Sequence, residues 1–229
     1  MMQLIPVTDK TTAEQFLQVA VDLNKNDPNW IRPLDKDINE VFDKEKNKAF
    51  RFGEVIRWIL KDDAGKLIGR IATFTNKKYK NKGDDVPVGG IGFFECINDQ
   101  AAADLLLDNG RHWLIQHGME AMDGPINFGE RDRWWGLITE GYTPPLYCMN
   151  YNPPITLHFL RITGLNYFIT RYVLHWMLKN RWLKKPWSGI KCMKTIRTLA
   201  LIPSKKITCQ SMCWILWKCT IRHGRGMAD

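Results

Sequence analysis

Residues 91–128, IGFFECINDQAAADLLLDNGRHWLIQHGMEAMDGPINF, decide the fold. The apolar run from Ile91 to Ile97 is typical of a buried strand, and Asn98 or Asp99 can cap the helix that follows. Apolar side chains recur on one face of that helix, and Gly118 ends it. A second short apolar run begins directly afterwards. The stretch therefore predicts a strand, a helix and another buried strand in succession.

The preceding residues predict two helices and a hairpin. In TTAEQFLQVAVDLNK, residues 11–25, Thr11 and Glu14 form a capping-box pattern ahead of an amphipathic helix. INEVFDKEKNKAF, residues 38–50, predicts a short second helix. Two β-rich runs within residues 54–76 are joined by the turn Asp-Asp-Ala-Gly. The whole order indicates an α/β (α+β layered) fold with a mixed, mostly antiparallel sheet flanked by helices.

Composition places the chain among globular proteins. It has 229 residues, of which 45% are hydrophobic, and a net charge of +9. No apolar segment typical of a signal peptide follows the first residues, and residues 1–154 contain only Cys96 and Cys148, which fits a reducing cytoplasm. The longest apolar stretch of the tail, residues 155–178, is too interrupted by His, Arg and Asn for a membrane span. We expect a cytoplasmic protein.

A dense set of motifs lies between residues 124 and 154. It reads GPxN, then WGL, EGY and PP, then YNPP. With the element order, it resembles the GNAT superfamily of acyl-CoA-dependent N-acyltransferases, and most closely a bacterial branch of uncharacterised acyltransferase-like proteins. The matching residues are Gly124, Pro125, Asn127, Asp132, Trp135, Gly136, Leu137, Glu140, Gly141, Tyr142, Pro144, Pro145, Tyr151, Asn152 and Pro153.

The resemblance implies a binding site for acetyl-CoA or another acyl-CoA. In the family, the thioester lies where two neighbouring strands splay apart, and the pyrophosphate lies at the N-terminus of the next helix. The residues that match are Phe93, Phe94, Cys96, Ile97, Asn98, Asp99, Gln100 and Ala101. The family's phosphate loop, Q/R-x-x-G-x-G/A, is replaced by INDQAAAD, which has no glycine and places a carboxylate at the mouth. This departure favours the alternative of a non-catalytic GNAT-fold binding module.

Three residues are candidates for catalysis. By resemblance, Glu95 is the general base that takes a proton from the acceptor amine, and Tyr147 or Tyr151 could protonate the departing thiolate. The structural alternatives are an exposed strand carboxylate and tyrosines that pack in an aromatic loop.

The segment GERDRWWGL could line a pocket for a small-molecule or peptide amine acceptor. Its candidate substrate-binding residues are Asn127, just upstream, with Glu130, Arg131, Asp132 and Trp135. A self-paired charge cluster over a core tryptophan is the alternative. His112 and His117 have no Cys or His partner nearby, so we expect no metal site there. The sequence leaves the oligomeric state open.

The tail, residues 155–229, differs sharply in composition. It holds 14 Lys and Arg against one acidic residue, Asp229, whereas residues 1–154 hold 19 against 23. Three interpretations compete. The tail could bind nucleic acid or an anionic membrane through cations interleaved with tryptophans. Cys209, Cys213, Cys219 and His223 could bind zinc, although the spacing between the two pairs is short. The third is that the tail is out of frame.

The out-of-frame interpretation explains the bias mechanically. Reading one base late converts Glu codons to Lys, Arg, Asn or Ser, and Asp codons to Ile, Met or Thr. A shifted-back reading satisfies every residue from Ile155 onward, regains acidic residues and supplies a tyrosine pair after YNPP. We therefore expect an incomplete GNAT-like domain at residues 1–154 and an out-of-frame tail at residues 155–229. The C-terminal part of the fold would then be missing, and the +9 charge would indicate no nucleic-acid or membrane partner. The expected activity is N-acyl transfer, and more specifically N-acetyl transfer, from acyl-CoA to an amine, and the chain as printed is expected to be unstable and inactive.

Overall fold

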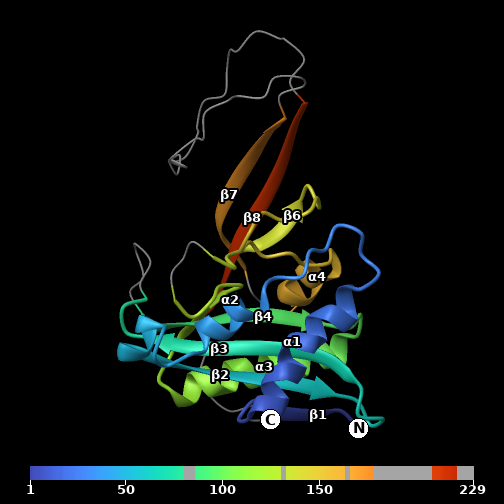
Figure 1. Ribbon diagram of the computed structural model, residues 1–229. Coiled ribbons are helices and arrows are strands. Elements are labelled where there is room, and N and C mark those ends of the chain that lie inside the picture. The colour runs from blue at the N-terminus through green and yellow to red at the C-terminus, as the bar shows by residue number, and fades with distance from the viewer. Residues whose placement is uncertain (80–85, 130–132, 163–165, 178–207, 221–229) are drawn as a thin grey trace, which may run out of the picture.

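The computed structural model describes residues 1–79, 86–129, 133–162, 166–177 and 208–220. The helices and strands predicted from the sequence follow one another in the predicted order, with further elements at both ends (Figure 1). The elements are β1 (Gln3–Pro6), α1 (Lys10–Asn24), α2 (Asp35–Val41), a 3-10 helix (Lys48–Arg51), β2 (Gly53–Lys61), β3 (Leu67–Asn76), β4 (Val88–Cys96), α3 (Gln100–Gln116), β5 (Ala121–Gly124), β6 (Leu137–Glu140), α4 (Ile155–Ile162), β7 (Asn166–Met177) and β8 (Thr208–Thr220).

The described strands form one mixed sheet. Its order is β1-β2-β3-β4-β5-β8-β6, and β7 pairs with β8. Every pairing is antiparallel except that of β4 with β5, which is parallel. The parallel pair is joined by α3, as parallel strands require a crossover connection. The predicted fold class, a mixed and mostly antiparallel sheet flanked by helices, is confirmed.

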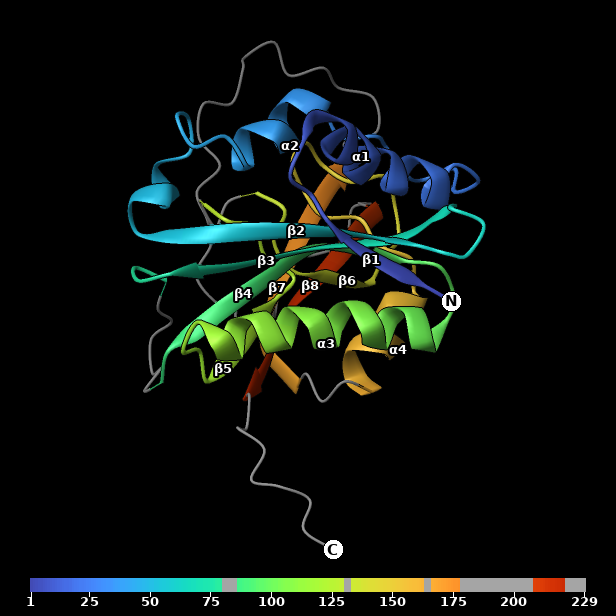
Figure 2. The same ribbon diagram turned by 90° about the horizontal axis from the view of Figure 1, so that it is seen from below.

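Helices cover both faces of the sheet. Figure 2 shows α1 and α2 on one face, and α3 with α4 on the other. One apolar cluster joins Phe16 of α1 and Ile38 of α2 to the sheet. A second cluster joins Leu106 of α3 and Phe159 of α4 to the opposite face. The layered arrangement follows from these two amphipathic surfaces, because each helix buries its apolar stripe against the sheet.

Local sequence signals explain most element boundaries. Asp99 caps α3 by accepting a hydrogen bond from the Ala102 amide at 2.9 Å, as one of the two predicted caps. The predicted cap of α1 is wrong: Asp9, with Thr12, forms the capping box, so that helix begins before Thr11. Gly65 closes the β2–β3 turn with a φ of 79°. The strands β1 and β6 were not predicted from the sequence.

A bulge in β4 interrupts its pairing with β3. Ala72 lies opposite Gly92 and Arg70 lies opposite Glu95, so β4 carries one extra residue between these points. Phe93 within the bulge has a φ of 48°, which a residue with a bulky side chain rarely adopts. The bulge sends Phe93 into the apolar cluster under α1, while the next residue, Phe94, packs in the cluster under α3.

Beyond the bulge, β4 separates from the segment that follows β5. The two strands pair only along residues 88–90 and 121–123, and the Ile126 amide then donates to the Ile91 carbonyl at 2.8 Å. The backbone of Ile126 lies so close to Gly92 that a side chain at Gly92 would collide with it. Past this point a cleft lies between the two segments. The fold thus produces the predicted splay.

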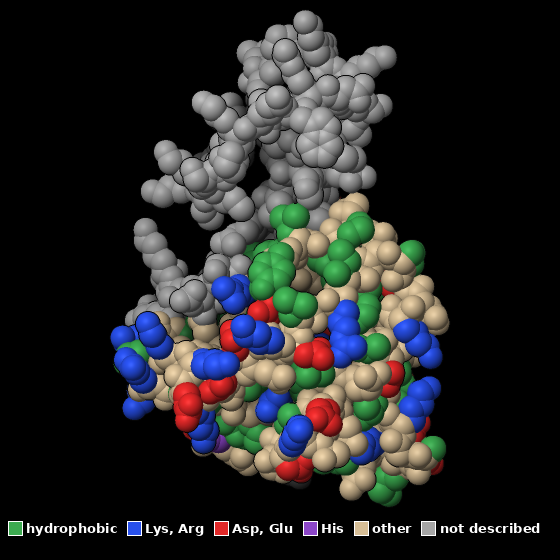
Figure 3. Space-filling view, in the orientation of Figure 1, with side chains coloured by type: hydrophobic (Ala, Val, Ile, Leu, Met, Phe, Trp, Pro, Cys, Tyr) green, Lys and Arg blue, Asp and Glu red, His purple; other side chains and the backbone are tan. Residues whose placement is uncertain are grey.

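The described part of the tail continues the sheet. The backbone of β8 lies between β5 and β6, and β7 pairs along β8 from residues 166–177. Figure 1 shows the far ends of β7 and β8 extending away from the rest of the sheet. In Figure 3, Lys, Arg, Asp and Glu are interspersed over the lower part of the visible face, and hydrophobic side chains gather toward its upper part. None of the helices in the described ranges has the length and hydropathy of a membrane crossing.

Candidate functional site

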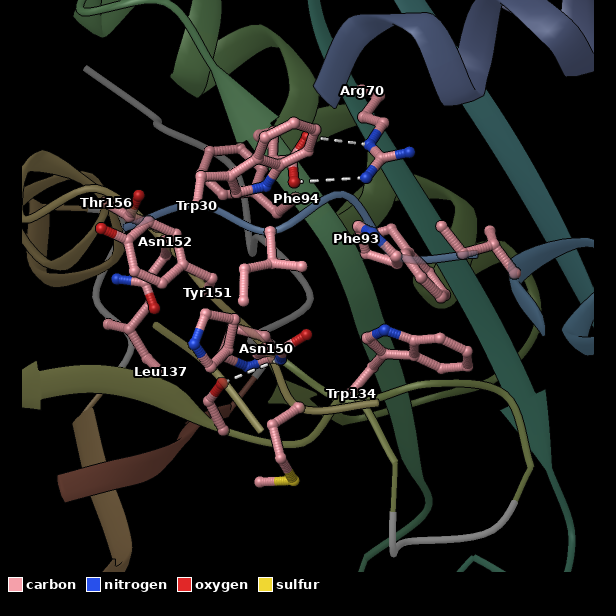
Figure 4. Close-up of a pocket in the computed structure, with 18 residues that line it drawn as sticks. Trp30, Arg70, Phe93, Phe94, Trp134, Leu137, Asn150, Tyr151, Asn152 and Thr156 are labelled. Atoms are coloured by element: carbon pink, nitrogen blue, oxygen red, sulfur yellow. Dashed lines mark hydrogen bonds and ion pairs between the residues drawn. The ribbon is translucent and has the colours of Figure 1, made fainter. Parts of the chain in front are cut away.

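A small cleft opens at the splay of β4 and the segment after β5 (Figure 4). Its free volume is about 40 Å³, enough for a water-sized group. A substrate must therefore displace lining side chains as it enters. The lining comes from the loop before α2, α2 itself, β3, β4, the segment from Pro125 to Leu137, the segment before α4, and α4. The residues are Trp30, Ile31, Pro33, Ile38, Arg70, Phe93, Phe94, Glu95, Pro125, Trp134, Gly136, Leu137, Pro145, Met149, Asn150, Tyr151, Asn152 and Thr156.

Glu95 enters the cleft as half of a buried ion pair. Its carboxylate accepts two hydrogen bonds from Arg70, at 3.0 Å from Nε and 3.2 Å from Nη2. The Arg70 side chain is 3% exposed and that of Glu95 is 12% exposed. Arg70 also donates from Nη1 to the Phe16 carbonyl at 2.8 Å and lies over the Phe16 ring. The carboxylate predicted as general base is therefore held in one orientation, with its charge balanced.

The two candidate tyrosines differ in position. Tyr151 lines the cleft, and its hydroxyl donates to Asp27 at 2.7 Å. Burial, with this hydrogen bond, raises the pKa of Tyr151. Tyr147 is 71% exposed and lies outside the cleft lining. Its hydroxyl donates to Asp37, and that hydrogen bond raises the pKa of Tyr147 to about 12. The structure therefore brings only Tyr151 together with Glu95.

The residues assigned to acyl-CoA divide into two groups. Phe93 and Phe94 line the cleft, and Phe93 lies in the bulge of β4. Cys96 and Ile97 are half-buried against the α3 cluster, and burial raises the pKa of the Cys96 thiol to about 12. Asn98 and Ala101 are exposed.

The N-terminus of α3 does not fit a pyrophosphate. Asp99 occupies it as the cap, with its carboxylate on the Ala102 amide. Gln100 donates to Asp104 at 2.7 Å and so is directed along the helix. A carboxylate at the positive end of the helix dipole competes with a bound anion and repels it. The first turn of α3 therefore does not fit the phosphates of CoA.

The two predicted acceptor-binding residues that the structure describes, Asn127 and Trp135, lie outside the cleft lining. Trp135 is 4% exposed and packs in the core. Asn127 is 8% exposed, and its side chain donates to the Arg133 carbonyl. Asn127 lines a neighbouring hollow. Trp134 lines both this hollow and the cleft. Glu130, Arg131 and Asp132 lie outside the described residues.

Sequence reasoning did not assign Trp30 or Arg70 to the cleft, and in GERDRWWGL it named Trp135 where the structure places Trp134 in the lining. The tryptophan pair in GERDRWWGL was a visible signal, but it could not indicate which ring faces the cleft. Arg70 could not be assigned from sequence, because its partner is 25 residues away on another strand. Among side chains in the described ranges, no group of three His, Cys, Asp or Glu gathers as metal ligands. His223 of the zinc interpretation lies outside those ranges.

Two curated proteins are similar in sequence. The bacterial ceramide synthase of Caulobacter vibrioides is 27% identical over 153 residues, covering 66% of this chain and 39% of that protein. Protein YghO of Escherichia coli is 28% identical over 148 residues, covering 64% of this chain and 37% of that protein. The chain thus spans less than two fifths of either relative. No family model matches.

Solved structures show the fold more directly. A glucosamine N-acetyltransferase region of a fungal multi-domain enzyme has a TM-score of 0.52 at 12% identity, covering 76% of this chain and 18% of that chain. A tandem GNAT protein from the clavulanic acid pathway has a TM-score of 0.51 at 13%, covering 77% and 47%. The protein yncA from Salmonella typhimurium, solved with acetyl-CoA, has a TM-score of 0.51 at 7%, covering 100% and 98%. At these identities the likeness shows the fold: this chain has the GNAT acetyltransferase fold.

Proposed function

We propose that this chain is an acyltransferase domain that moves an acyl group from acyl-CoA to an amine. The observation that supports this most is the position of Glu95. It is an anionic side chain between the aromatic walls of a cleft, at the point where β4 separates from its parallel neighbour in a GNAT fold. A carboxylate there can accept a proton from an amine that enters the cleft.

The proposed reaction uses few protein groups. The amine nitrogen attacks the thioester carbonyl carbon, a C–N bond forms, the C–S bond breaks, and CoA leaves as a thiol. Glu95 accepts the proton that the amine loses, and Arg70 holds the carboxylate in place through its two hydrogen bonds. Tyr151 is the better placed of the two candidate tyrosines to protonate the leaving sulfur, since it lines the cleft and Tyr147 does not.

Two observations support a substrate class: the side chains that line the cleft and the name of one sequence relative. Apolar and aromatic side chains dominate the lining, among them Trp30, Ile31, Phe94 and Met149. Such walls suit an alkyl chain better than a polar acceptor. One relative is named a bacterial ceramide synthase, and a ceramide is an N-acylated long-chain amine. We propose a long-chain amine as the acceptor and an acyl thioester as the donor.

A second candidate is a non-catalytic GNAT-fold binding module. The observation that favours it is Asp99, which places a carboxylate where the phosphates of CoA would bind. Titration with acetyl-CoA separates the two. An enzyme binds it with measurable affinity, whereas a module that has lost the donor site shows no heat of binding at millimolar concentrations.

We also propose that residues 155–229 are read out of frame. The tail has a single acidic residue, and the two sequence matches, of 153 and 148 residues, are close in length to the segment that ends at Pro154. The backbone of β8 lies between β5 and β6, but a backbone position does not depend on which reading frame supplied the side chains. The proposal is therefore tested on the nucleotide sequence. Independent sequencing across codons 150–160 tests it, and an uninterrupted frame in every read would overturn it.

The activity test compares glutamate variants in the frame-restored chain and in the 229-residue chain. Each is incubated with acyl-CoA and hexadecylamine, and thiol release is measured. Glu95→Gln should lower kcat by about 100-fold, as loss of a general base does. Glu45→Gln, at an exposed position, is the matched control and should leave kcat unchanged. Equal rates for Glu95→Gln and the control would exclude Glu95 as the base.

A further inference from the structure

Trp134 is held in a strained backbone conformation at the cleft. Its φ is 41°, in the left-handed region that a tryptophan rarely adopts. Its backbone amide donates to the Cys148 carbonyl at 2.7 Å, and the preceding carbonyl, that of Arg133, accepts from the Asn127 side chain. Strain of this kind persists only where the surroundings fix it, and it gathers at binding and catalytic sites. The predicted acceptor residue Asn127 thus holds the segment that carries Trp134.

The indole N–H of Trp134 lacks an acceptor within the described residues. The side chain is 4% exposed, and Nε1 is buried without a hydrogen bond. Its ring packs against Phe93, with the centroids 5.5 Å apart, and Figure 4 shows the nitrogen on the edge turned toward Phe93. A buried donor without a partner costs about 1–3 kcal/mol. A buried donor of this kind is normally paired with an ordered water or with an oxygen of a ligand.

Other polar groups of the cleft are already engaged. Asn152 accepts from the Ile138 amide at 2.8 Å and donates to the Ile138 carbonyl at 3.2 Å. Asn150 donates to the Gly136 carbonyl at 2.8 Å. Both amides therefore fix the lining segments to one another. Of the side chains considered, the Trp134 N–H has no acceptor within the described residues, and the Glu95 carboxylate, although paired with Arg70, keeps lone pairs that can accept from an ammonium.

We propose that Trp134 is the specificity-determining residue that recognises a hydroxyl oxygen on the acyl acceptor, next to the amine. The inference rests on the proposed function, because it assigns the amine to Glu95. The acceptor class is then a long-chain amino alcohol: its amine faces Glu95, its hydroxyl accepts from the Trp134 N–H, and its chain lies along the aromatic walls. When the amino alcohol enters the cleft, it displaces lining side chains and its hydroxyl reaches the buried Nε1 of Trp134.

The test uses two amines that differ by one hydroxyl group, hexadecylamine and 1-aminohexadecan-2-ol. Acyl transfer to each is measured in the frame-restored chain and the 229-residue chain. The wild type should prefer the amino alcohol by about 10-fold in kcat/KM, the effect of one buried hydrogen bond. Trp134→Phe removes the N–H and keeps an aromatic ring, so the ratio should fall to about 1 while hexadecylamine is still acylated.

Trp135→Phe is the matched control, because it makes the same change in the neighbouring core tryptophan. It should keep the 10-fold ratio even where it lowers stability. If the wild type acylates both amines equally, the inference is overturned without recourse to any variant. If Trp134→Phe slows both substrates by the same factor, the N–H acts on the thioester carbonyl, and the inference is again overturned. If neither chain acylates either amine, the proposed function itself fails.

Discussion

The segments before and after Pro154 differ in their content of acidic residues: the first has 23 and the second has one. In the first segment carboxylates have specific structural partners: Asp9 and Asp99 cap helices, Asp62 closes a turn and Glu95 pairs with Arg70. After Pro154 no acidic residue occurs until Asp229, so residues 155–228 supply no carboxylate of their own to cap a helix or pair a cation. The difference teaches that the carboxylates of a folded domain are tied to particular backbone and charged groups, and that a segment without them lacks these specifying contacts.

Restoring the frame should have the largest effect. The shifted-back tail regains carboxylates and supplies side chains selected to cover β5 and β6, so the frame-restored chain should be monodisperse and melt cooperatively. The 229-residue chain should aggregate, because its exposed strand edges and apolar surface promote association. Size-exclusion chromatography and calorimetric melting of both chains check this. If the 229-residue chain is soluble and melts cooperatively, the expectation that its tail destabilises the domain is wrong.

The Arg70–Glu95 pair gives the next largest effect. In the frame-restored chain, Arg70→Met should lower the free energy of unfolding by about 3–5 kcal/mol, because Glu95 keeps a buried charge without its partner. Arg32→Met is the control: its pair with Asp35 is about half exposed, and its loss should cost about 0–1 kcal/mol. Urea unfolding measures both. Equal losses would mean that burial of the pair does not matter.

Replacing Asp99 should lower the free energy of unfolding and raise the affinity for acetyl-CoA. Asp99→Ala should lower the free energy of unfolding by about 1 kcal/mol through loss of the α3 cap. The same change removes a carboxylate from the helix N-terminus, so acetyl-CoA should bind more tightly. Asp9→Ala removes the cap of α1 and should destabilise similarly without changing acetyl-CoA affinity. Thermal melts and calorimetric titration of both variants decide whether the two effects separate.

The smallest effect concerns Tyr147. Its pKa is raised to about 12 by the hydrogen bond to Asp37, while an unfolded tyrosine titrates near 10. The folded state therefore favours the protonated phenol, and this contribution is fully present below about pH 10 and lost as the pH rises toward 12. The melting temperature of the wild type should fall toward that of Tyr147→Phe over this range. If the difference in melting temperature between the wild type and Tyr147→Phe is the same at pH 9 and pH 12, the titration of Tyr147 does not contribute to stability.

Sequence signals were sufficient for the elements with strong local patterns. The hairpin of β2 and β3, the helix α3 with its Asp99 cap and the strand β4 were predicted, because turn residues, caps and apolar runs are local. The splay of β4 was implied by the family resemblance. The strands β1 and β6, each four residues long, are too short to show a period.

The site was only partly predictable for a related reason. Glu95 and Tyr151 were placed in the cleft by family resemblance, but Arg70 enters through a contact between strands. Nothing local in GERDRWWGL distinguishes Trp134, which turns to the cleft, from Trp135, which turns to the core. That choice depends on a backbone φ of 41° that tertiary contacts enforce.

Gly92 has a consequence for how this cleft could vary among proteins of the same fold. The backbone of Ile126 rests where any side chain at Gly92 would project, so this glycine sets the closest approach of the two strands. Replacement by alanine would push the Ile126 segment outward and shift the Pro125 and Trp134 wall with it. The width of the cleft is thus set by a backbone contact beneath it, at a position outside the cleft lining.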